Sequence, residues 1–319
     1  MSEPQFDLDV VLSLFDGISC GQEALKRAGI STRIFLASEI EKAPKLITRK
    51  NHPLTVQLGC VKTVKGENLP KVDLIFAGSP CQDVSFSNGK GKGLVKGERS
   101  NLFFEFVRVL EECRKFNPDV KFLLENVKMK KEYQDIISEH LGVEPVMICS
   151  SLVSAQSRKR LYWTNIPITE IKDKGILLKD ILEGDVEVNR NIPDEVIHTE
   201  VKKLLKGSKY ENNFKWKWDT AGRILVMRPD GMKIQRIGRL AFPDNKTEIV
   251  TAVTQPHTTY RKLSVLECSR LQTLPDSYLQ DCFDDKGKDI SNSQKFKALG
   301  NGWTVDVIVH LLQGIKWQS

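Results

Sequence analysis

The first half of the chain alternates short apolar runs with amphipathic stretches, and this alternation limits the folds open to it. The apolar runs predict strands over residues 10–15, 34–38, 72–78 and 122–124. The stretches between them predict helices over residues 21–28, 42–51 and 102–116. Strands that alternate with helices favour an α/β fold with a doubly wound, mostly parallel sheet. Ligands bind such sheets at the carboxyl ends of the strands, so a functional site is expected in the loops there.

The alternation stops after residue 166, and the character of the chain changes. The part that follows is rich in lysine, contains tryptophan and has short β-like pieces. We predict a main domain that begins with residues 1–166, a smaller inserted domain over residues 167–255, and a return to the main domain over residues 256–319. A length of 319 residues suits two such lobes.

Composition excludes several classes of protein. Hydrophobic residues make up 40% and charged residues 28%, which is typical of a globular chain. No apolar run approaches the roughly 20 residues of a membrane span, and the acidic stretch 1–9 lacks the basic start of a signal peptide. The seven cysteines include no C-x-x-C pair, which argues against a disulfide framework and a structural metal site. We therefore expect a protein without a metal ion in a reducing compartment.

The positive charge is concentrated in one window. Residues 201–239 hold eleven Lys and Arg against three Asp and Glu, a net charge of +8, so the rest of the chain is close to neutral. Four aromatic residues, Tyr210, Phe214, Trp216 and Trp218, lie among them. This mixture fits contacts to nucleic-acid phosphates and bases, although a solvated basic face with core aromatics would look the same.

Four groups of polar residues follow or adjoin the predicted strands. Phe15–Gly21 forms a glycine-containing turn before a helix and Glu39 follows the second strand, as in nucleoside sites, but Ser19 breaks the full G-x-G-x-x-G pattern. Cys81 follows Pro80 directly and precedes a loop rich in glycine and lysine. Glu125 is predicted in a loop at a strand end, where it could act as an acid or a base. On a strand, Gln156, Arg158 and Arg160 would share one face. Taken singly, each group also fits a purely structural role, such as a buried cysteine, a salt-bridged glutamate or a basic edge strand.

The order of these motifs carries more information than any one of them. The motifs follow one another in this order: Phe15-Asp16-Gly17-Ile18, Glu39, Pro80-Cys81-Gln82, Glu125-Asn126-Val127, Gln156-x-Arg158-x-Arg160, then Arg261-Lys262-Leu263-Ser264 with Glu267, Arg270-Leu271-Gln272 and Pro275-Asp276, and finally Gly300-Asn301-Gly302-Trp303-Thr304-Val305. The set resembles the DNA cytosine-5 methyltransferase family over nearly the whole chain except about residues 167–255. The first and last motifs are most similar to the vertebrate de novo enzymes, whereas Pro80-Cys81-Gln82 has the form usual in bacterial and phage members, which serve restriction-modification or phage modification.

The resemblance implies a catalytic role for four residues. Cys81 would be the nucleophile that adds to carbon 6 of cytosine, and Glu125 would hold and protonate ring nitrogen 3. Arg160, supported by Arg158, would contact the carbonyl oxygen of the base and the loop that carries Cys81. Carbon 5 would then take the methyl group of S-adenosylmethionine, which leaves as S-adenosylhomocysteine. The cytosine would be flipped out of duplex DNA for this chemistry.

The resemblance also assigns binding residues. The implied cofactor residues are Phe15, Asp16, Gly17, Glu39, Ile40, Cys60, Val61, Pro80, Leu102, Asn301, Trp303 and Val305. Cys60 stands where the family usually has an aspartate that accepts a hydrogen bond from the adenine amino group, so we expect weakened cofactor binding. Residues 167–255 would form the target-recognition domain. The implied DNA-binding residues are Ser85, Ser87, Lys90, Lys92, Arg228, Arg236 and Arg239.

Two other functions fit parts of the pattern. A related enzyme acting on transfer RNA would carry a Cys-Phe-Thr signature in its recognition region, and residues 167–255 contain none. A catalytically silent DNA-binding paralogue is disfavoured because Cys81, Glu125 and Arg160 are all present, although Cys60 leaves it some room. The preferred hypothesis is an active enzyme on double-stranded DNA, working as a monomer or a homodimer. The resemblance implies a cytoplasmic location if the protein is prokaryotic or phage-encoded, and a nuclear one if it is eukaryotic.

Overall fold

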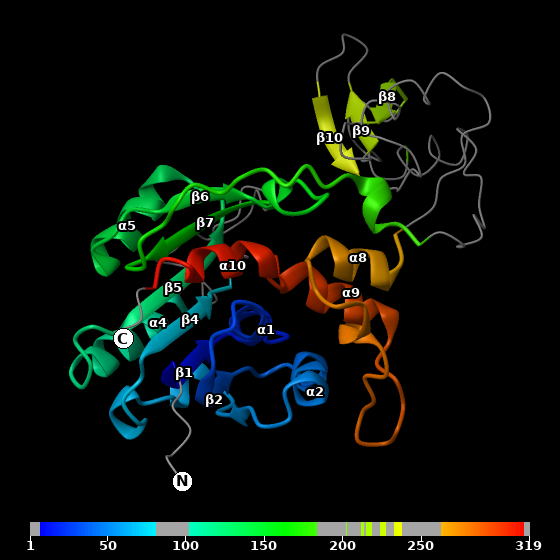
Figure 1. The fold of residues 1–319 in the computed structure, drawn as a ribbon. Coiled ribbons are helices and arrows are strands. Elements are labelled where there is room, and N and C mark those ends of the chain that lie inside the picture. Colours follow the sequence, from blue (N-terminus) through cyan, green and yellow to red (C-terminus); the bar gives the residue numbers. More distant parts are fainter. Residues whose placement is uncertain are drawn as a thin grey trace.

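The computed structural model contains two sheets with helices packed around the larger one (Figure 1). It describes residues 7–80, 102–183, 202, 212–213, 215–218, 224–227, 233–237 and 263–315. Side chains are not described for residue 179 or within 216–218, 224–227 and 233–237. Among the described residues, no helix has the length and apolar character that crossing a membrane requires.

The larger sheet has seven strands in the order β3-β2-β1-β4-β5-β7-β6. Their bounds are β1 Leu8–Leu14, β2 Thr32–Ser38, β3 Val56–Gln57, β4 Leu74–Gly78, β5 Lys121–Val127, β6 Val146–Cys149 and β7 Lys159–Thr164. Neighbouring strands from β3 to β5 run parallel, and β7 is antiparallel to both of its neighbours. The prediction of a mostly parallel sheet is therefore confirmed. Strand order reverses between β1 and β4, and ligands bind parallel sheets at such a point.

Helices cover both faces of this sheet, which confirms the doubly wound arrangement. The α-helices of the described residues are α1 Cys20–Arg27, α2 Lys42–Asn51, α4 Leu102–Arg114, α5 Lys131–Leu141, α8 Val265–Leu271, α9 Asn292–Asn301 and α10 Val305–Leu312. Side chains alternate along a strand, so Val10, Leu12 and Leu14 of β1 join the core under α4 and α5, whereas Val11 joins the core under α1 and α10. The apolar runs of the central strands are thus buried on both sides, as a covered parallel sheet requires.

Two details of the predicted elements were wrong. Glu125–Val127 is not a loop, because β5 continues to Val127 and pairs in antiparallel fashion with Arg160–Tyr162 of β7. Gln156 and Arg158 are not on a strand, because β7 begins only at Lys159. The strand partner supplies hydrogen bonds that extend β5 beyond its apolar run, and no pattern within residues 121–127 reveals that partner.

The smaller sheet is an antiparallel meander of β8 Lys215–Trp218, β9 Ile224–Met227 and β10 Lys233–Ile237. All three strands fall inside the range 167–255 that the sequence assigns to a second domain. The domain boundaries themselves stay a prediction.

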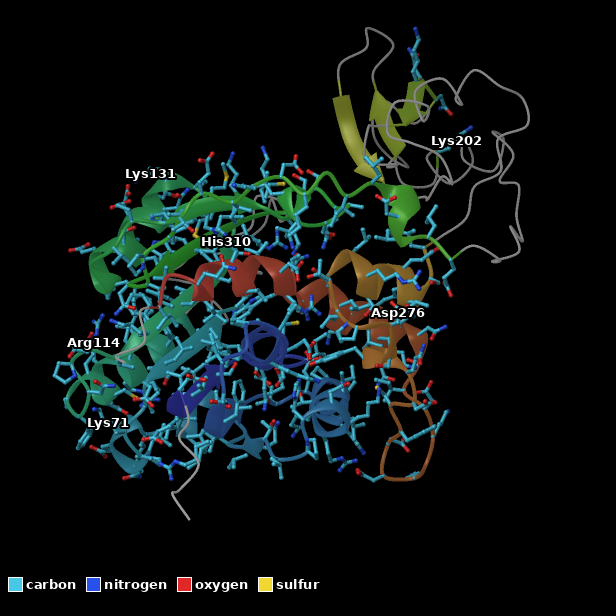
Figure 2. The ribbon with its side chains drawn as sticks, in the orientation of Figure 1. Lys71, Arg114, Lys131, Lys202, Asp276 and His310 are labelled. Atoms are coloured by element: carbon cyan, nitrogen blue, oxygen red, sulfur yellow. The ribbon has the colours of Figure 1, made fainter. Side chains whose placement is uncertain are left out.

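The segment that leaves β7 runs along α10. The Nε2 atom of His310, which Figure 2 labels on α10, lies 2.9 Å from the backbone oxygen of Thr169. A side chain at Gly314 would place its Cβ 1.8 Å from the oxygen of Pro167, so the two backbones can approach only because residue 314 is glycine. Residues 167–169 are therefore tied to α10 and to the turn that follows it.

Two buried hydrogen bonds, made by Tyr278, connect His52 at the end of α2 to the loop after β1. The hydroxyl of Tyr278 donates to the backbone oxygen of Ile18 at 2.7 Å, and Nε2 of His52 lies 3.2 Å from the same hydroxyl. Because the hydroxyl proton is already used, His52 must donate through Nε2. Burial lowers the pKa of His52 to about 4 and raises the pKa of Tyr278. Both groups therefore stay neutral at pH 7, and the two hydrogen bonds persist.

This pair predicts a loss of stability in acid. The folded pKa of His52 lies below its usual 6.5, so the unfolded chain binds more protons, and stability falls as pH drops from about 6.5 to 4. The shift corresponds to about 3 kcal/mol at full extent. A His52→Gln variant keeps a donor for Tyr278 but does not titrate, so urea unfolding at pH 7.5 and at pH 4 should show a smaller acid loss for the variant. Equal acid losses in both proteins would contradict the assignment.

Candidate active site

The loop between β1 and α1 lies at the point where strand order reverses, and its backbone is strained. Phe15, Gly17 and Ser19 have φ angles of 57°, 58° and 54°, a left-handed conformation that costs energy at the two non-glycine positions. Tyr278 holds this loop through Ile18, and Ser38 at the end of β2 accepts from the backbone nitrogen of Asp16 at 3.1 Å. Such over-determined strain is typical of a binding site.

Glu39 follows β2 and fastens the same loop. Its Oε2 accepts from the backbone nitrogen of Gly17 at 2.9 Å, and its Oε1 accepts from the backbone nitrogens of Ile40 and Glu41, each at 2.7 Å. The carboxylate is half-buried, and a carboxylate oxygen has room for two donors. Oε2 therefore keeps acceptor capacity beside Gly17.

Asp16 carries the carboxyl group of this loop, and its pKa is strongly raised. Burial raises its pKa to about 7 and the charge of Glu39 adds to the effect, while interactions with the side chains of Ser13 and Ser19 offset part of it. The Ser19 hydroxyl donates to Oδ2, and no partner lies within hydrogen-bond distance of the buried Oδ1 in the structure as far as it is described. A buried acceptor without a partner is costly, so Oδ1 is suited to a donor from a ligand.

The other predicted cofactor residues near β2 differ in exposure. Ile40 is 69% exposed, which is unusual for a large apolar side chain beside a buried loop. Cys60 is exposed and precedes the short 3₁₀ helix η1, Val61–Thr63, in which Val61 is buried. Ser38 donates through its hydroxyl to the backbone oxygen of Gly59 at 2.8 Å, so the end of β2 also positions the residues before Cys60.

The end of β4 is fixed to β5 beside Glu125. The side-chain nitrogen of Asn126 lies 3.0 Å from the hydroxyl and 3.4 Å from the backbone oxygen of Ser79, the residue before Pro80. Pro80 is half-buried, and the chain continues from it into Cys81. Several predicted site residues lie outside the described residues: Cys81, Ser85, Ser87, Lys90, Lys92, Arg228 and Arg239. For Arg236, the structure describes only its backbone, which lies in β10.

Glu125 has both carboxylate oxygens occupied. It is 8% exposed, Nε of Arg160 contacts Oε1 at 2.8 Å, and the indole Nε1 of Trp303 donates to Oε2 at 3.2 Å. Arg160 is on β7, in register with Val127. The pairing of β5 with β7 thus brings the acid and its arginine together.

The remaining members of the Gln156–Arg160 motif contact other groups. Arg158 donates through Nη2 to the backbone oxygens of Gly300 at 3.1 Å and Gly302 at 2.9 Å. Gln156 is buried and donates to the side-chain oxygen of Gln272 at 2.9 Å. Arg160 thus contacts the Glu125 carboxylate, whereas the described contacts of Gln156 and Arg158 go to Gln272 and to the backbone before Trp303. That the three side chains share one site stays a prediction.

The other predicted residues come from α4, from the end of α9 and from the residues that follow it. Leu102, at the start of α4, is half-buried. Asn301 is exposed, Val305 is fully buried, and Trp303 is buried with its ring 5.8 Å from that of Phe76 in an edge-on contact. The site thus joins the carboxyl ends of β1, β2, β4 and β5 to the C-terminal return of the chain.

Sequence reasoning missed three residues that organise this site: Tyr278, Gln272 and Asn126. Each acts by hydrogen bonding to residues of the motifs, and Tyr278 contacts Ile18 across 260 residues of chain. Asn126 and Gln272 were quoted within motifs without a role, and the position of Asn126 beside Glu125 at a strand end is the signal that could have found it. No group of His, Cys, Asp and Glu among the described residues is arranged to hold a metal ion.

Comparisons with known proteins identify the family. The family model for C-5 cytosine-specific DNA methylases matches residues 10–317. The chain is 27% identical to the type II methyltransferase M.FnuDI of Fusobacterium nucleatum, with 96% of this chain and 94% of that protein covered. It is 26% identical to the type II methyltransferase M.NlaX of Neisseria lactamica, with 96% of each chain covered.

Solved structures share the fold. The Entamoeba histolytica methyltransferase EhMeth matches 96% of this chain and 97% of its own with a TM-score of 0.67 and 16% identity. A DNMT2 mutant of Spodoptera frugiperda matches 96% of this chain and 99% of its own with a TM-score of 0.60 and 20% identity. The family predicted from the order of the motifs is confirmed by the model that spans residues 10–317: this chain belongs to the C-5 cytosine-specific DNA methylase family.

Proposed function

We propose that this chain transfers a methyl group from S-adenosylmethionine to carbon 5 of cytosine in duplex DNA, through a covalent adduct with Cys81. Membership of the family supports cytosine-5 methyl transfer to DNA. The observation that carries the finer proposal is the buried Glu125 carboxylate, held by Arg160 and Trp303 next to the Ser79-Pro80 segment that leads into Cys81.

Cys81 and Glu125 share the activation of the base. The thiolate of Cys81 forms a bond to carbon 6, and the electron pair of the 5,6 double bond makes carbon 5 nucleophilic. Glu125 holds ring nitrogen 3 and supplies the proton that compensates the charge placed on the ring. Arg160 orients Glu125 and stays within reach of the carbonyl oxygen of the base. Once carbon 5 carries the methyl group, loss of its proton and breakage of the bond from sulfur to carbon 6 restore the double bond and the thiolate.

The depth of Glu125 supports base flipping. A carboxylate that is 8% exposed at the end of a central strand is not accessible to a cytosine stacked inside a duplex. The base must leave the stack to reach it, at a cost of a few kcal/mol in unstacking. Contacts from the basic window 201–239 would offset that cost, and the β8–β10 sheet lies inside this window. We assign residues 167–255 as the target-recognition domain, with Arg228, Arg236 and Arg239 toward DNA.

The residues after β1 and β2 fit the cofactor. S-adenosylmethionine supplies an electrophilic methyl group when bound, and it carries an ammonium group and ribose hydroxyls that need acceptors. The unpartnered Oδ1 of Asp16 and the free acceptor capacity of Glu39 Oε2 provide them. The exposed Ile40 offers an apolar contact. Trp303, Asn301, Val305, Pro80, Leu102, Phe15 and Val61 complete the proposed pocket.

The relatives support a setting for the activity. They come from bacteria and from Bacillus phages, and they are named type II and orphan methyltransferases. We propose a cytoplasmic modification enzyme that works as a monomer or a homodimer.

The function is tested by transfer of labelled methyl groups from S-adenosylmethionine to duplex DNA, followed by bisulfite sequencing of the product. We expect 5-methylcytosine in a defined sequence context. Cys81→Ala should abolish turnover and leave DNA binding intact, and Cys113→Ala, which alters a cysteine buried on α4, serves as the control. Turnover of Cys81→Ala within about tenfold of wild type would refute the nucleophile. Tight DNA binding by folded wild type without incorporation would show a catalytically silent paralogue.

Asp16 makes cofactor binding dependent on pH. Because burial raises its pKa to about 7, the carboxyl group is largely neutral at pH 6 and ionised at pH 8. Binding of a cationic ligand should therefore tighten as pH rises from 6 to 7.5, by up to about tenfold per pH unit. Calorimetric titration of S-adenosylmethionine into wild type and Asp16→Asn checks this. The variant should bind more weakly at pH 7.5 and show a flatter profile, and a wild-type profile as flat as that of the variant would contradict the role of Asp16.

Cys60 sets a limit on cofactor affinity. An aspartate at this exposed position, at the start of η1, would accept a hydrogen bond that a thiol accepts poorly. Cys60→Asp should lower the dissociation constant of S-adenosylmethionine by about three- to tenfold, the range of one net hydrogen bond. Cys60→Ser is the matched control without a carboxylate. Equal dissociation constants for wild type and Cys60→Asp would refute the prediction.

A further inference from the structure

The end of α9 and the residue after it are held by hydrogen bonds from Arg158 and Gln272. Arg158 donates to the backbone oxygens of Gly300 and Gly302, and Gln272 donates through Nε2 to the backbone oxygen of Leu299 at 2.7 Å. These contacts fix the backbone on the N-terminal side of Trp303.

Thr304 is held just as closely on the other side. Its hydroxyl donates to the side-chain oxygen of Gln272 at 2.9 Å and lies 2.8 Å from the hydroxyl of Ser150, and Gln156 approaches it at 3.3 Å. All four side chains are buried. Trp303 therefore sits on a short segment whose backbone is clamped before and after it.

The indole ring of Trp303 points its N–H group at Glu125. The distance from Nε1 to Oε2 is 3.2 Å, and the ring rests edge-on against Phe76. Gly78 of β4 makes this approach possible, because a Cβ at that position would lie 3.0 Å from Nε1. Three residues, Phe76 and Gly78 of β4 and Glu125 of β5, thus determine where the indole N–H lies.

The two donors to Glu125 come from different parts of the chain and bind different oxygens. Arg160 of β7 contacts Oε1, and Trp303 of the C-terminal return contacts Oε2. A carboxylate held on one oxygen can still rotate about its last bond, whereas one held on both keeps a single orientation. Orientation to within about 0.5 Å is what acid–base catalysis requires of such a group.

We propose that Trp303 is a positioning residue for Glu125, and that Gln156 and Arg158 act on the reaction through Trp303 rather than by touching the base. This inference rests on the proposed function of Glu125 and goes beyond the cofactor contact assigned to Trp303. It gives Gln156 and Arg158 the same task as Arg160: each maintains one orientation of a single carboxyl group.

The test uses Trp303→Phe, which keeps an aromatic ring against Phe76 and removes the N–H group together with the five-membered ring. We expect the single-turnover rate of methyl transfer at saturating S-adenosylmethionine to fall about tenfold. Loss of a cofactor contact alone would raise the dissociation constant and leave this saturated rate unchanged. Trp163→Phe is the matched control, because the buried Trp163 on β7 donates through Nε1 to the hydroxyl of Ser138 at 3.0 Å, away from Glu125. This control should lose stability and keep the methyl-transfer rate.

A double-mutant cycle tests the action of Arg158 through Trp303. Arg158→Lys keeps the charge and should lose the geometry of the two contacts to Gly300 and Gly302. If Arg158 acts through Trp303, the rate of the double variant equals that of the slower single variant; multiplied losses would overturn this part of the proposal.

The outcomes separate this inference from the proposed function. A wild type that methylates no duplex DNA would overturn the proposed function. With an active wild type, a Trp303→Phe variant that keeps the rate, or that loses cofactor affinity in place of rate, would overturn the positioning role alone.

Discussion

The Glu125 carboxylate, held between Arg160 and Trp303, is the interaction on which the rest of the site depends. Its two partners lie on β7 and on the C-terminal return, and the indole nitrogen reaches it across 178 residues of chain. A buried carboxylate is stable only when its oxygens are satisfied, so the fold must bring both partners to it. The predicted inserted domain, residues 167–255, lies between these partners in the sequence, and the segment 167–169 at its start is seated against α10 and Gly314.

The sheet supplies the geometry for this contact. Parallel β4 and β5 place Gly78 opposite Glu125, antiparallel β7 places Arg160 beside Val127, and Asn126 ties Ser79 to the same edge. The proposed cofactor half of the site is built separately, from the strained loop after β1 and its contacts to Glu39 and Tyr278. The two halves meet where Trp303 contacts Glu125. Hydrogen bonds made by a few polar side chains thus complement a core that the apolar strands build on their own.

Much of the fold follows from the sequence, and the limits have physical causes. β1, β2, β4 and the core of β5 are runs of apolar residues buried on both faces, so their pattern is visible without a partner. β3 and β6 are short, carry exposed side chains such as Val56 and Met147, and show no such pattern. The end of β5 and the start of β7 depend on each other, so neither could be placed alone. The contacts of Tyr278 with Ile18 and of Trp303 with Glu125 join residues far apart in the chain, which local patterns do not record.

The indole resonance of Trp303 in a ¹H–¹⁵N spectrum tests the central contact most directly. It can be assigned by its disappearance in Trp303→Phe and followed in Glu125→Ala. If the N–H group donates to the Glu125 carboxylate, removal of that carboxylate should move the Trp303 resonance and speed its exchange with solvent. The resonance of Trp163, which donates to Ser138, should stay where it is. An unmoved Trp303 resonance in a folded Glu125→Ala protein would contradict the account.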